Sequence, residues 1–337
     1  MALLIPKPLK KGDTIGFISP SAGPNPKAIH RIYQAKKNLE LLGYKVIFAK
    51  NSLKNDSYVS GTVDERVQDI HDMFSNTEVS MIMCTIGGNN SNQLLKYIDY
   101  SLIRKNPKIF IGYSDITVLH YAFMSQSNLA TYCGPCAMTQ FGEFPSTLEY
   151  TLKFFNFAVT LEHKDLSYKI GQSDTWTEEF LDWFKKQDQE RPRKLNPNTG
   201  YEWLWKGKSS GEILGGTILS LNHLVGTMYW CDPKGKIFFL DILQESGCLD
   251  EPSIEAFLTD FDNQGLFDVI NGLIIGRLSN CTPELTERIK KRISELTSNK
   301  GYPVLFNANI GHVDPIITLR YGSMASLDSF KDEFKII

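Results

Sequence analysis

The sequence predicts an α/β protein with an N-terminal Rossmann-like parallel sheet covered by helices. It also predicts a smaller C-terminal α/β domain with a mixed or barrel-like sheet. Two observations predict this class. Short apolar runs of strand length alternate with amphipathic stretches through residues 1–160, which is typical of a parallel sheet with crossover helices. A second series begins at Gly211, and 337 residues comfortably fill two cores.

The elements of the first half follow from the spacing of their apolar residues. The expected strands cover residues 14–19, 44–48, 79–85 and 108–113. The expected helices cover residues 27–42, 63–75 and 115–123. The first helix carries apolar residues at helical spacing and is closed by Gly43, a typical residue after a helix C-terminus.

The second half repeats this alternation after a different middle segment. Residues 211–216 precede a helical stretch to about Gly226. Further strands are expected at 236–241, 272–276 and 303–306, and helices at 252–264 and 283–298.

The middle segment is polar, rich in turn residues and contains four tryptophans, which favours an ordered excursion folded over a site. We therefore divide the chain into an N-terminal domain (1–164), an inter-domain linker and active-site loop (165–208) and a C-terminal domain (209–337).

Composition and charge exclude several classes of protein. The net charge is -2, with basic and acidic residues mixed along the chain, so neither a nucleic acid nor an anionic membrane is an expected partner. The apolar run in the opening MALLIPKPLKKGD is too short for a secretory signal or a membrane-spanning helix, so a cytoplasmic protein is expected. The six histidines show no metal-ligand spacing, and no metal or cofactor is expected.

Six cysteines are scattered through the chain, which argues against a disulfide scaffold. Cys133 and Cys136 form the sequence CGPC, the redox motif of thioredoxin-like proteins. That chemistry requires a long amphipathic helix after the motif, but here the pattern breaks within nine residues. A buried structural turn is therefore favoured over a redox site.

Ser114 is the candidate nucleophile. It lies where the strand at 108–113 turns into a helix, and open α/β sheets bind ligands at this carboxyl edge. The N–H groups that begin the helix could stabilise an oxyanion there, as in a nucleophile elbow. The alternative is that Ser114 caps the helix and Asp115 complements its dipole, and the local sequence alone favours this alternative.

Three other stretches could carry chemistry. The glycine-rich turn at 85–92 could bind a phosphate, donate N–H groups to an oxyanion or simply allow a tight turn. His312 follows a glycine on a loop, where it could be a general base or a solvated side chain. Asp241 ends a predicted strand and could orient a histidine or belong to a solvated acidic loop.

Taken in order, these stretches resemble one serine peptidase family, the L,D-carboxypeptidases and microcin C immunity peptidases. The resemblance covers nearly the whole chain and is carried by residues 12–17, 60–62, 86–92, 112–115, 134–135, 215–216, 273–276 and 311–315. The sequence GGNNSN and residues 176–179 (WTEE) are closer to the microcin immunity branch.

The resemblance implies a Ser-His-Glu triad on a two-domain fold. Ser114 would be the nucleophile and His312 the base, and the N–H groups of Gly88 and Asp115 would form the oxyanion hole. The resemblance also implies a Gly-Pro turn at 134–135, which makes the flanking cysteines incidental.

The chain departs from the family pattern at three places. Asp241 stands at the catalytic glutamate position, which withdraws the carboxylate by roughly 1.5 Å, one C–C bond. An aspartate remains a competent triad member, and Glu245 is the alternative acid. Gln244 and Glu245 replace basic residues that suit a nucleotide, and Thr217 replaces an asparagine. We expect Asn89, Trp176 and Glu245 as substrate-binding candidates.

These residues predict a cofactor-free serine peptidase or amidase that cleaves an amide bond in small peptidyl or aminoacyl-nucleotide conjugates. The first alternative is a murein tetrapeptide L,D-carboxypeptidase, and the second is a catalytically impaired homologue that only binds such ligands. The family resemblance also implies a homodimer.

Overall fold

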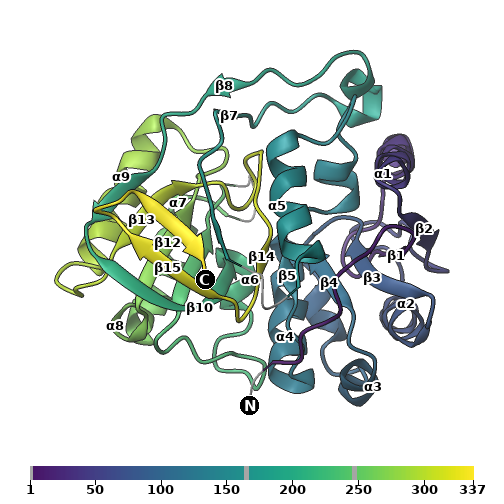
Figure 1. Ribbon diagram of the computed structural model, residues 1–337, viewed down its shortest axis with the longest axis horizontal. Helices are drawn as coiled ribbons and strands as arrows, with labels where there is room; N and C mark the ends of the chain where they lie inside the picture. The colour runs from purple at the N-terminus through teal and green to yellow at the C-terminus, as the bar shows by residue number, and fades with distance from the viewer. Residues whose placement is uncertain (1–2, 163–166, 245–248) are drawn as a thin grey trace.

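The computed structural model describes residues 3–162, 167–244 and 249–337. It confirms the predicted class: one mostly parallel sheet with helices and one mixed sheet that curls into half a barrel lie side by side (Figure 1). The candidate Glu245 lies outside the described residues.

The N-terminal sheet has six strands in the order β14-β5-β4-β3-β1-β2, all parallel except β14. These strands are β1 (Thr14–Ile18), β2 (Lys45–Phe48), β3 (Val79–Cys84), β4 (Ile109–Gly112), β5 (Tyr132–Cys133) and β14 (Leu319–Arg320). Every residue of β1 and β4 is buried, because helices cover both faces of a parallel sheet and its strands are continuous apolar runs.

The helices of this half connect successive strands. They are α1 (Ile29–Leu41), α2 (Val63–Ser75), α3 (Tyr100–Lys105), α4 (Thr117–Ser127) and α5 (Glu149–Thr160), with short helical turns η1 (Pro26–Ala28), η2 (Ser91–Leu94), η3 (Ser114–Ile116) and the π-helical η4 (Ala137–Phe141). Helix α2 matches its predicted range because its first turn is fixed by a capping box between Thr62 and Glu65.

The C-terminal sheet has eight strands in the order β6-β16-β15-β10-β11-β12-β13-β9. They are β6 (Tyr168–Lys169), β9 (Glu202–Trp205), β10 (Lys208–Thr217), β11 (Ile237–Asp241), β12 (Gly272–Gly276), β13 (Val304–Ala308), β15 (Met324–Asp328) and β16 (Glu333–Ile336). The four central strands, β10 to β13, are parallel, and the flanking strands are antiparallel. The accompanying helices are α6 (Ile218–Asn222), α7 (Glu251–Asn263), α8 (Leu266–Val269) and α9 (Pro283–Leu296).

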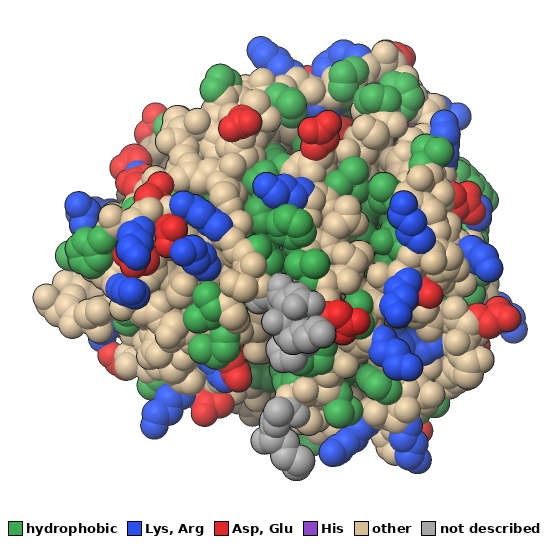
Figure 2. All heavy atoms as spheres, in the orientation of Figure 1, with side chains coloured by type: hydrophobic (Ala, Val, Ile, Leu, Met, Phe, Trp, Pro, Cys, Tyr) green, Lys and Arg blue, Asp and Glu red, His purple; other side chains and the backbone are tan. Residues whose placement is uncertain are grey.

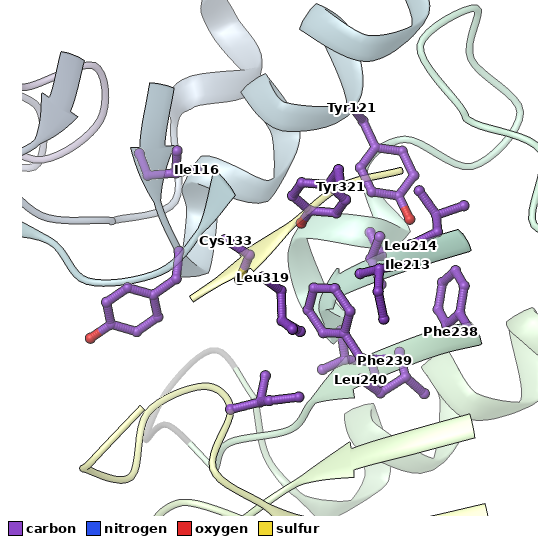
Figure 3. Packing of buried hydrophobic residues seen from close by; sticks show 14 of the residues in the cluster. Ile116, Tyr121, Cys133, Ile213, Leu214, Phe238, Phe239, Leu240, Leu319 and Tyr321 are labelled. Carbon is purple, nitrogen blue, oxygen red and sulfur yellow. The ribbon is translucent and has the colours of Figure 1, made fainter. Parts of the chain in front are cut away.

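One hydrophobic cluster crosses between the two halves of the molecule. Figure 3 shows side chains of α4, β5 and β14 packing against those of β10 and β11. Strand β14, late in the chain, pairs with β5 of the first half at Leu319–Cys133 and Arg320–Tyr132. The loop that carries His312 therefore leads directly into the sheet that carries Ser114.

The middle segment runs along the upper edge of Figure 1 and joins the two halves. Its strands β6 and β9 extend the C-terminal sheet, and β7 (Thr175–Trp176) pairs with β8 (Asn196–Pro197). Between these strands lie the short turns η6 (Trp183–Lys185) and η7 (Gln187–Gln189). The described part of the excursion, residues 167–208, thus has defined structure, as its aromatic content predicts, while the predicted domain boundaries stay a prediction.

Two predicted helices differ clearly in extent from the observed ones, whereas α1, α7 and α9 begin and end within two residues of their predicted bounds. The helix expected at 115–123 begins as the turn η3 and continues as α4 to Ser127, where Asn128 adopts a left-handed conformation (φ 58°). The helical stretch expected to reach Gly226 is only the short α6, followed by turns. The spacing of apolar residues predicted that both helices exist. It did not predict their ends, which are set by a left-handed residue in one case and by turns in the other.

Candidate active site

Ser114 lies directly after β4, in a turn whose geometry is strained. Its φ of 64° is in the left-handed region, which a residue with a side chain adopts only when its surroundings hold it there. Gly112 and Gly87 make this turn possible. A Cβ on Gly112 would come within 3.0 Å of Ile116, and one on Gly87 within 2.9 Å of Ser114 Cβ.

The helix-cap alternative for Ser114 is wrong. Tyr113, not Ser114, is the N-cap residue of η3, and Ile116 is the N-cap residue of α4. Neither helix start has a side-chain capping hydrogen bond. The Ser114 side chain faces His312 instead, with its Oγ 3.0 Å from His312 Nε2.

His312 is brought to Ser114 from 198 residues further along the chain. Its other ring nitrogen, Nδ1, lies 2.9 Å from Asp241 Oδ2. The three side chains therefore form a continuous chain from hydroxyl to imidazole to carboxylate. The His312 side chain is 20% exposed and that of Asp241 only 3%, so the histidine can reach a ligand while the acid is shielded from water.

Asp241 ends β11 in a buried position. Burial would raise the pKa of this carboxyl, but the nearby His312 and hydrogen bonds from His312 and Thr217 hold its pKa below the usual value. Thr217 donates its hydroxyl proton to Asp241 Oδ2 over 2.6 Å. The carboxylate is thus ionised and shares one oxygen between a histidine and a threonine, so the solvated-loop alternative for Asp241 is wrong.

The glycine turn after β3 lies against the nucleophile. Gly88 has a φ of 146°, and a Cβ there would come within 2.9 Å of the Ala22 nitrogen. A Cβ on the preceding Gly87 would lie 3.5 Å from the Asp115 nitrogen, which shows how closely the two loops approach. The Asp115 N–H is in the first turn of its helix, where N–H groups lack intrahelical partners.

A buried network fixes this pair of loops. The Asp115 carboxylate accepts hydrogen bonds from the Ser21 hydroxyl (2.5 Å) and the Ser91 N–H (2.8 Å). Ser21 also accepts a hydrogen bond from the Asn90 N–H (3.3 Å), so one hydroxyl connects both loops. The side chain of Asp115 therefore has a structural task, since it holds the loops that contain Ser21 and Ser91 beside the start of η3. Asn89 lies exposed in the same turn.

A cavity of about 310 Å³ opens beside His312 and Tyr113. The middle segment supplies two of its aromatic side chains, Phe180 and Trp183. The indole of Trp183 packs against the guanidinium of Arg31, 4.2 Å from the ring centroid. This volume suits a small ligand rather than a polymer.

Buried charges attach the middle segment to both halves of the protein. Arg193 forms ion pairs with Asp314 (2.7 Å) and Glu143 (2.9 Å), and Arg31 forms one with Asp188 (2.8 Å). Burial opposes the charge on Arg193, but Asp314 and Glu143 raise its pKa. Both arginines at the cavity are already neutralised by carboxylates of the protein.

Sequence reasoning missed Trp183 and Arg193, although both lie within the segment that it singled out. It selected Trp176 instead, whose ring stacks on Arg277 at 5.0 Å and whose indole N–H donates to the Pro197 carbonyl (3.1 Å). Trp176 does not line the cavity beside His312 as the described residues define it. The polar, turn-rich composition identified the segment, but no local sequence pattern distinguishes Trp183 from Trp176.

The CGPC sequence is a buried turn. Cys133 belongs to β5, and Cys136 precedes the five-residue π-helix η4 rather than a long α-helix. Burial raises the pKa of both thiols, that of Cys136 to about 12, whereas a redox thiolate needs a lowered pKa. The structural interpretation of this motif therefore agrees with the structure, and the redox alternative does not.

Two kinds of feature are absent from the described residues. No helix in residues 3–162, 167–244 and 249–337 has the length and apolar character needed to cross a bilayer. Within the same ranges, no group of three or more His, Cys, Asp or Glu side chains could hold a metal ion. On the face seen in Figure 2, basic and acidic side chains are interspersed.

Comparison with known families matches both halves of the chain. The profile described as "LD-carboxypeptidase N-terminal domain" matches residues 15–134, and "LD-carboxypeptidase C-terminal domain" matches residues 210–327.

Curated relatives align over almost the whole length. The chain is 32% identical to the "Microcin C7 self-immunity protein MccF" of Escherichia coli, with 96% of this chain and 93% of that protein covered. It is also 32% identical to a Bacillus subtilis (strain 168) protein named "Probable murein peptide carboxypeptidase", with 96% and 91% covered.

Solved structures show the same relationship. An MccF-like protein from Bacillus anthracis superposes with a TM-score of 0.89 at 35% identity, with 99% of each chain covered. MccF in complex with aspartyl sulfamoyl adenosine superposes with a TM-score of 0.90 at 30% identity, with 99% of this chain and 98% of that chain covered.

Proposed function

The chain belongs to the LD-carboxypeptidase family of serine peptidases, and from that premise we propose that it hydrolyses an amide bond with Ser114, His312 and Asp241 as its catalytic triad. The observation that carries this proposal is the position of His312. Its two ring nitrogens lie 3.0 Å from Ser114 Oγ and 2.9 Å from Asp241 Oδ2. These separations are hydrogen-bond distances, and this geometry defines the triad in unrelated folds.

The reaction follows from these positions. Ser114 Oγ attacks the carbonyl carbon while His312 Nε2 accepts the hydroxyl proton, and the buried Asp241 stabilises the imidazolium that forms. The N–H groups of Gly88 and Asp115 would donate to the oxyanion of the tetrahedral intermediate. His312 then gives its proton to the leaving amine, and a water molecule hydrolyses the acyl-enzyme by the same route in reverse.

The left-handed turn at Ser114 supports the role of nucleophile. Ser114 is the first residue of η3, and in this conformation its Oγ lies 3.0 Å from His312 Nε2. Such strain, of order 1–3 kcal/mol, persists where the surrounding structure over-determines it and clusters at active sites. An aspartate in place of glutamate still reaches His312, which favours an enzyme over a homologue that only binds.

We propose small peptidyl or aminoacyl-nucleotide conjugates as substrates. The size of the cavity beside His312 and its aromatic side chains Phe180 and Trp183 support this class. The bound aspartyl sulfamoyl adenosine of MccF is a ligand of the same class. The second candidate is a murein tetrapeptide, cleaved by an L,D-carboxypeptidase activity. One observation favours this candidate. Arg31 and Arg193 at the cavity are both paired with carboxylates of the protein, so they offer little charge to a phosphate group, and a murein tetrapeptide has none.

A paired assay tests both the chemistry and the substrate. Wild-type protein and Ser114→Ala are incubated with a glutamyl or aspartyl conjugate of adenosine and, separately, with an L,D-tetrapeptide. The proposal expects cleavage of the adenosine conjugate and a loss of about 10⁴-fold or more in Ser114→Ala. Cleavage of the tetrapeptide alone would favour the second candidate.

A fluorophosphonate probe separates a wrong substrate from a wrong mechanism, because it labels an activated serine whatever the substrate. If the probe labels the wild type but not Ser114→Ala, the result supports the triad. Absence of labelling, together with absence of cleavage, would contradict the proposed hydrolase. If in that case Asp241→Glu created activity, the native chain would be better described as a ligand-binding homologue.

A further inference from the structure

The junction between β10 and α6 contacts both ends of the proposed triad, namely Asp241 and the segment that carries Ser114. Thr217, the last residue of β10, pairs in register with Asp241, the last residue of the parallel strand β11. Both side chains are buried, with 4% and 2% of their surface exposed. In this position the Thr217 hydroxyl donates to Asp241 Oδ2 over 2.6 Å, the same oxygen that lies 2.9 Å from His312 Nδ1.

The same junction contacts the segment that carries the nucleophile. The Thr217 N–H donates to Thr117 Oγ1 over 3.3 Å, and Thr117 is the first residue of α4, three residues after Ser114. One turn along α6, the Ser220 hydroxyl donates to the Ser114 carbonyl oxygen over 3.3 Å. A Cβ on Gly216 would overlap the Thr117 side chain, so this close approach requires glycine.

We propose that Thr217 is a positioning residue for the hydrolysis. Its hydroxyl holds the Asp241 carboxylate in the one orientation that faces His312, and its N–H holds the nucleophile segment against the acid-bearing strand. This inference rests on the proposed function, because its effect on rate passes through Asp241 and His312.

The physical reason is that aspartate is a short side chain with two equivalent oxygens. A rotation about its side-chain bonds would move Oδ2 away from His312 by about 1 Å, a displacement that can lower a rate on the order of 100-fold. The hydroxyl opposes this rotation, since a hydrogen bond to a buried carboxylate is lost when Oδ2 leaves. On the opposite side Gly311 leaves room for the other carboxylate oxygen, because a Cβ there would overlap Asp241 Oδ1.

Thr217→Val removes the hydroxyl and keeps the shape and the N–H, and Thr217→Ser keeps the hydroxyl. We expect kcat to fall roughly 10- to 100-fold in Thr217→Val with KM within about twofold, and Thr217→Ser to recover most of the activity. Thr147→Val is the matched control. Thr147 is also buried, but its hydroxyl has no partner among the described residues. This control should leave kcat unchanged within about twofold.

Proton NMR of the His312 Nδ1–H gives a second measurement that does not need turnover. The hydrogen bond to Asp241 should place this resonance far downfield in wild type and Thr217→Ser, and Thr217→Val should shift it upfield or broaden it. If Thr217→Val does not fold, as judged by circular dichroism, Thr217→Ala takes its place.

Two results would overturn the inference: a Thr217→Val protein with wild-type kcat and an unmoved resonance, or a loss of kcat that Thr217→Ser does not recover. A wild type that is inactive but shows the downfield resonance would count against the proposed function alone. In that case, the resonance in Thr217→Val would still decide the role of Thr217.

Discussion

Gly311→Ala is a sharp test of the triad, because it adds a single methyl group next to the acid. Gly311 precedes His312 and has a φ of 95°, and a Cβ added there would overlap Asp241 Oδ1 and come within 3.0 Å of Asp241 Cβ. Ordinary contacts between such atoms need roughly 3.5–4.0 Å. Either the carboxylate or the loop that carries His312 must therefore move by about 1 Å, which can lower the rate on the order of 100-fold.

The same substitution also has a backbone effect, which needs its own control. An alanine at this φ is destabilising by roughly 1–2 kcal/mol, since the left-handed region crowds its Cβ against the backbone. Gly12 has nearly the same φ, 90°, and a Cβ there would meet nothing within 4 Å. Gly12→Ala therefore carries the backbone penalty without the contact.

The assay compares both variants with wild type in urea denaturation and in kcat for the cleaved substrate. Both should lose about 1–2 kcal/mol of unfolding free energy through the backbone, and Gly311→Ala should lose roughly 1–3 kcal/mol more through its overlap with Asp241. Only Gly311→Ala should lose roughly 100-fold in kcat. If kcat of Gly311→Ala lies within a few-fold of that of Gly12→Ala, the contact with Asp241 does not control catalysis and the reasoning fails.

Three further predictions concern other parts of the site. Gly87→Ala should lower kcat by roughly 10- to 100-fold in steady-state assays, because its Cβ would lie 2.9 Å from Ser114 Cβ; unchanged kcat would mean that the turn can yield. Arg193→Met should lower the unfolding free energy in urea by about 3 kcal/mol, since two buried carboxylates would each lose an ion-pair partner; a loss below 1 kcal/mol would contradict this. The folded pKa of Asp241 is below its usual 3.8, so its contribution to stability is present at neutral pH and is lost as the pH falls through the folded pKa. Asp241→Asn should flatten that acid-side slope in denaturation curves, and an unchanged slope would show that other groups dominate it.

Much of the fold could be predicted from the sequence because its central strands are buried on both faces. Such strands are continuous apolar runs, so β1, β4 and β12 were visible without any knowledge of their neighbours. Strands β5 and β14 have two residues each and were not predicted. Elements this short have no periodicity, and only the packing around them defines their conformation.

The candidate site, like the fold, could be predicted from the sequence only in part. Ser114 could be chosen as a candidate because a strand-to-helix turn marks the carboxyl edge of a parallel sheet, but its left-handed conformation had no local signature. The pairing of Arg193 with Glu143 and Asp314 joins residues up to 121 positions apart, which no local pattern encodes. Family resemblance supplied what local patterns could not, namely that distant motifs belong to one site.

The pairing of β14 with β5 has a consequence for synthesis of the chain on the ribosome. When residues 1–160 have emerged, β5 is an open edge of the first sheet, and its partner at Leu319–Arg320 does not yet exist. Unpaired edges of this kind invite association with other chains. At β5 this open edge is only two residues long, which limits such association until residues 319–320 are made. The same step delivers His312 to Ser114, so the edge is covered and the proposed triad is completed at almost the same moment.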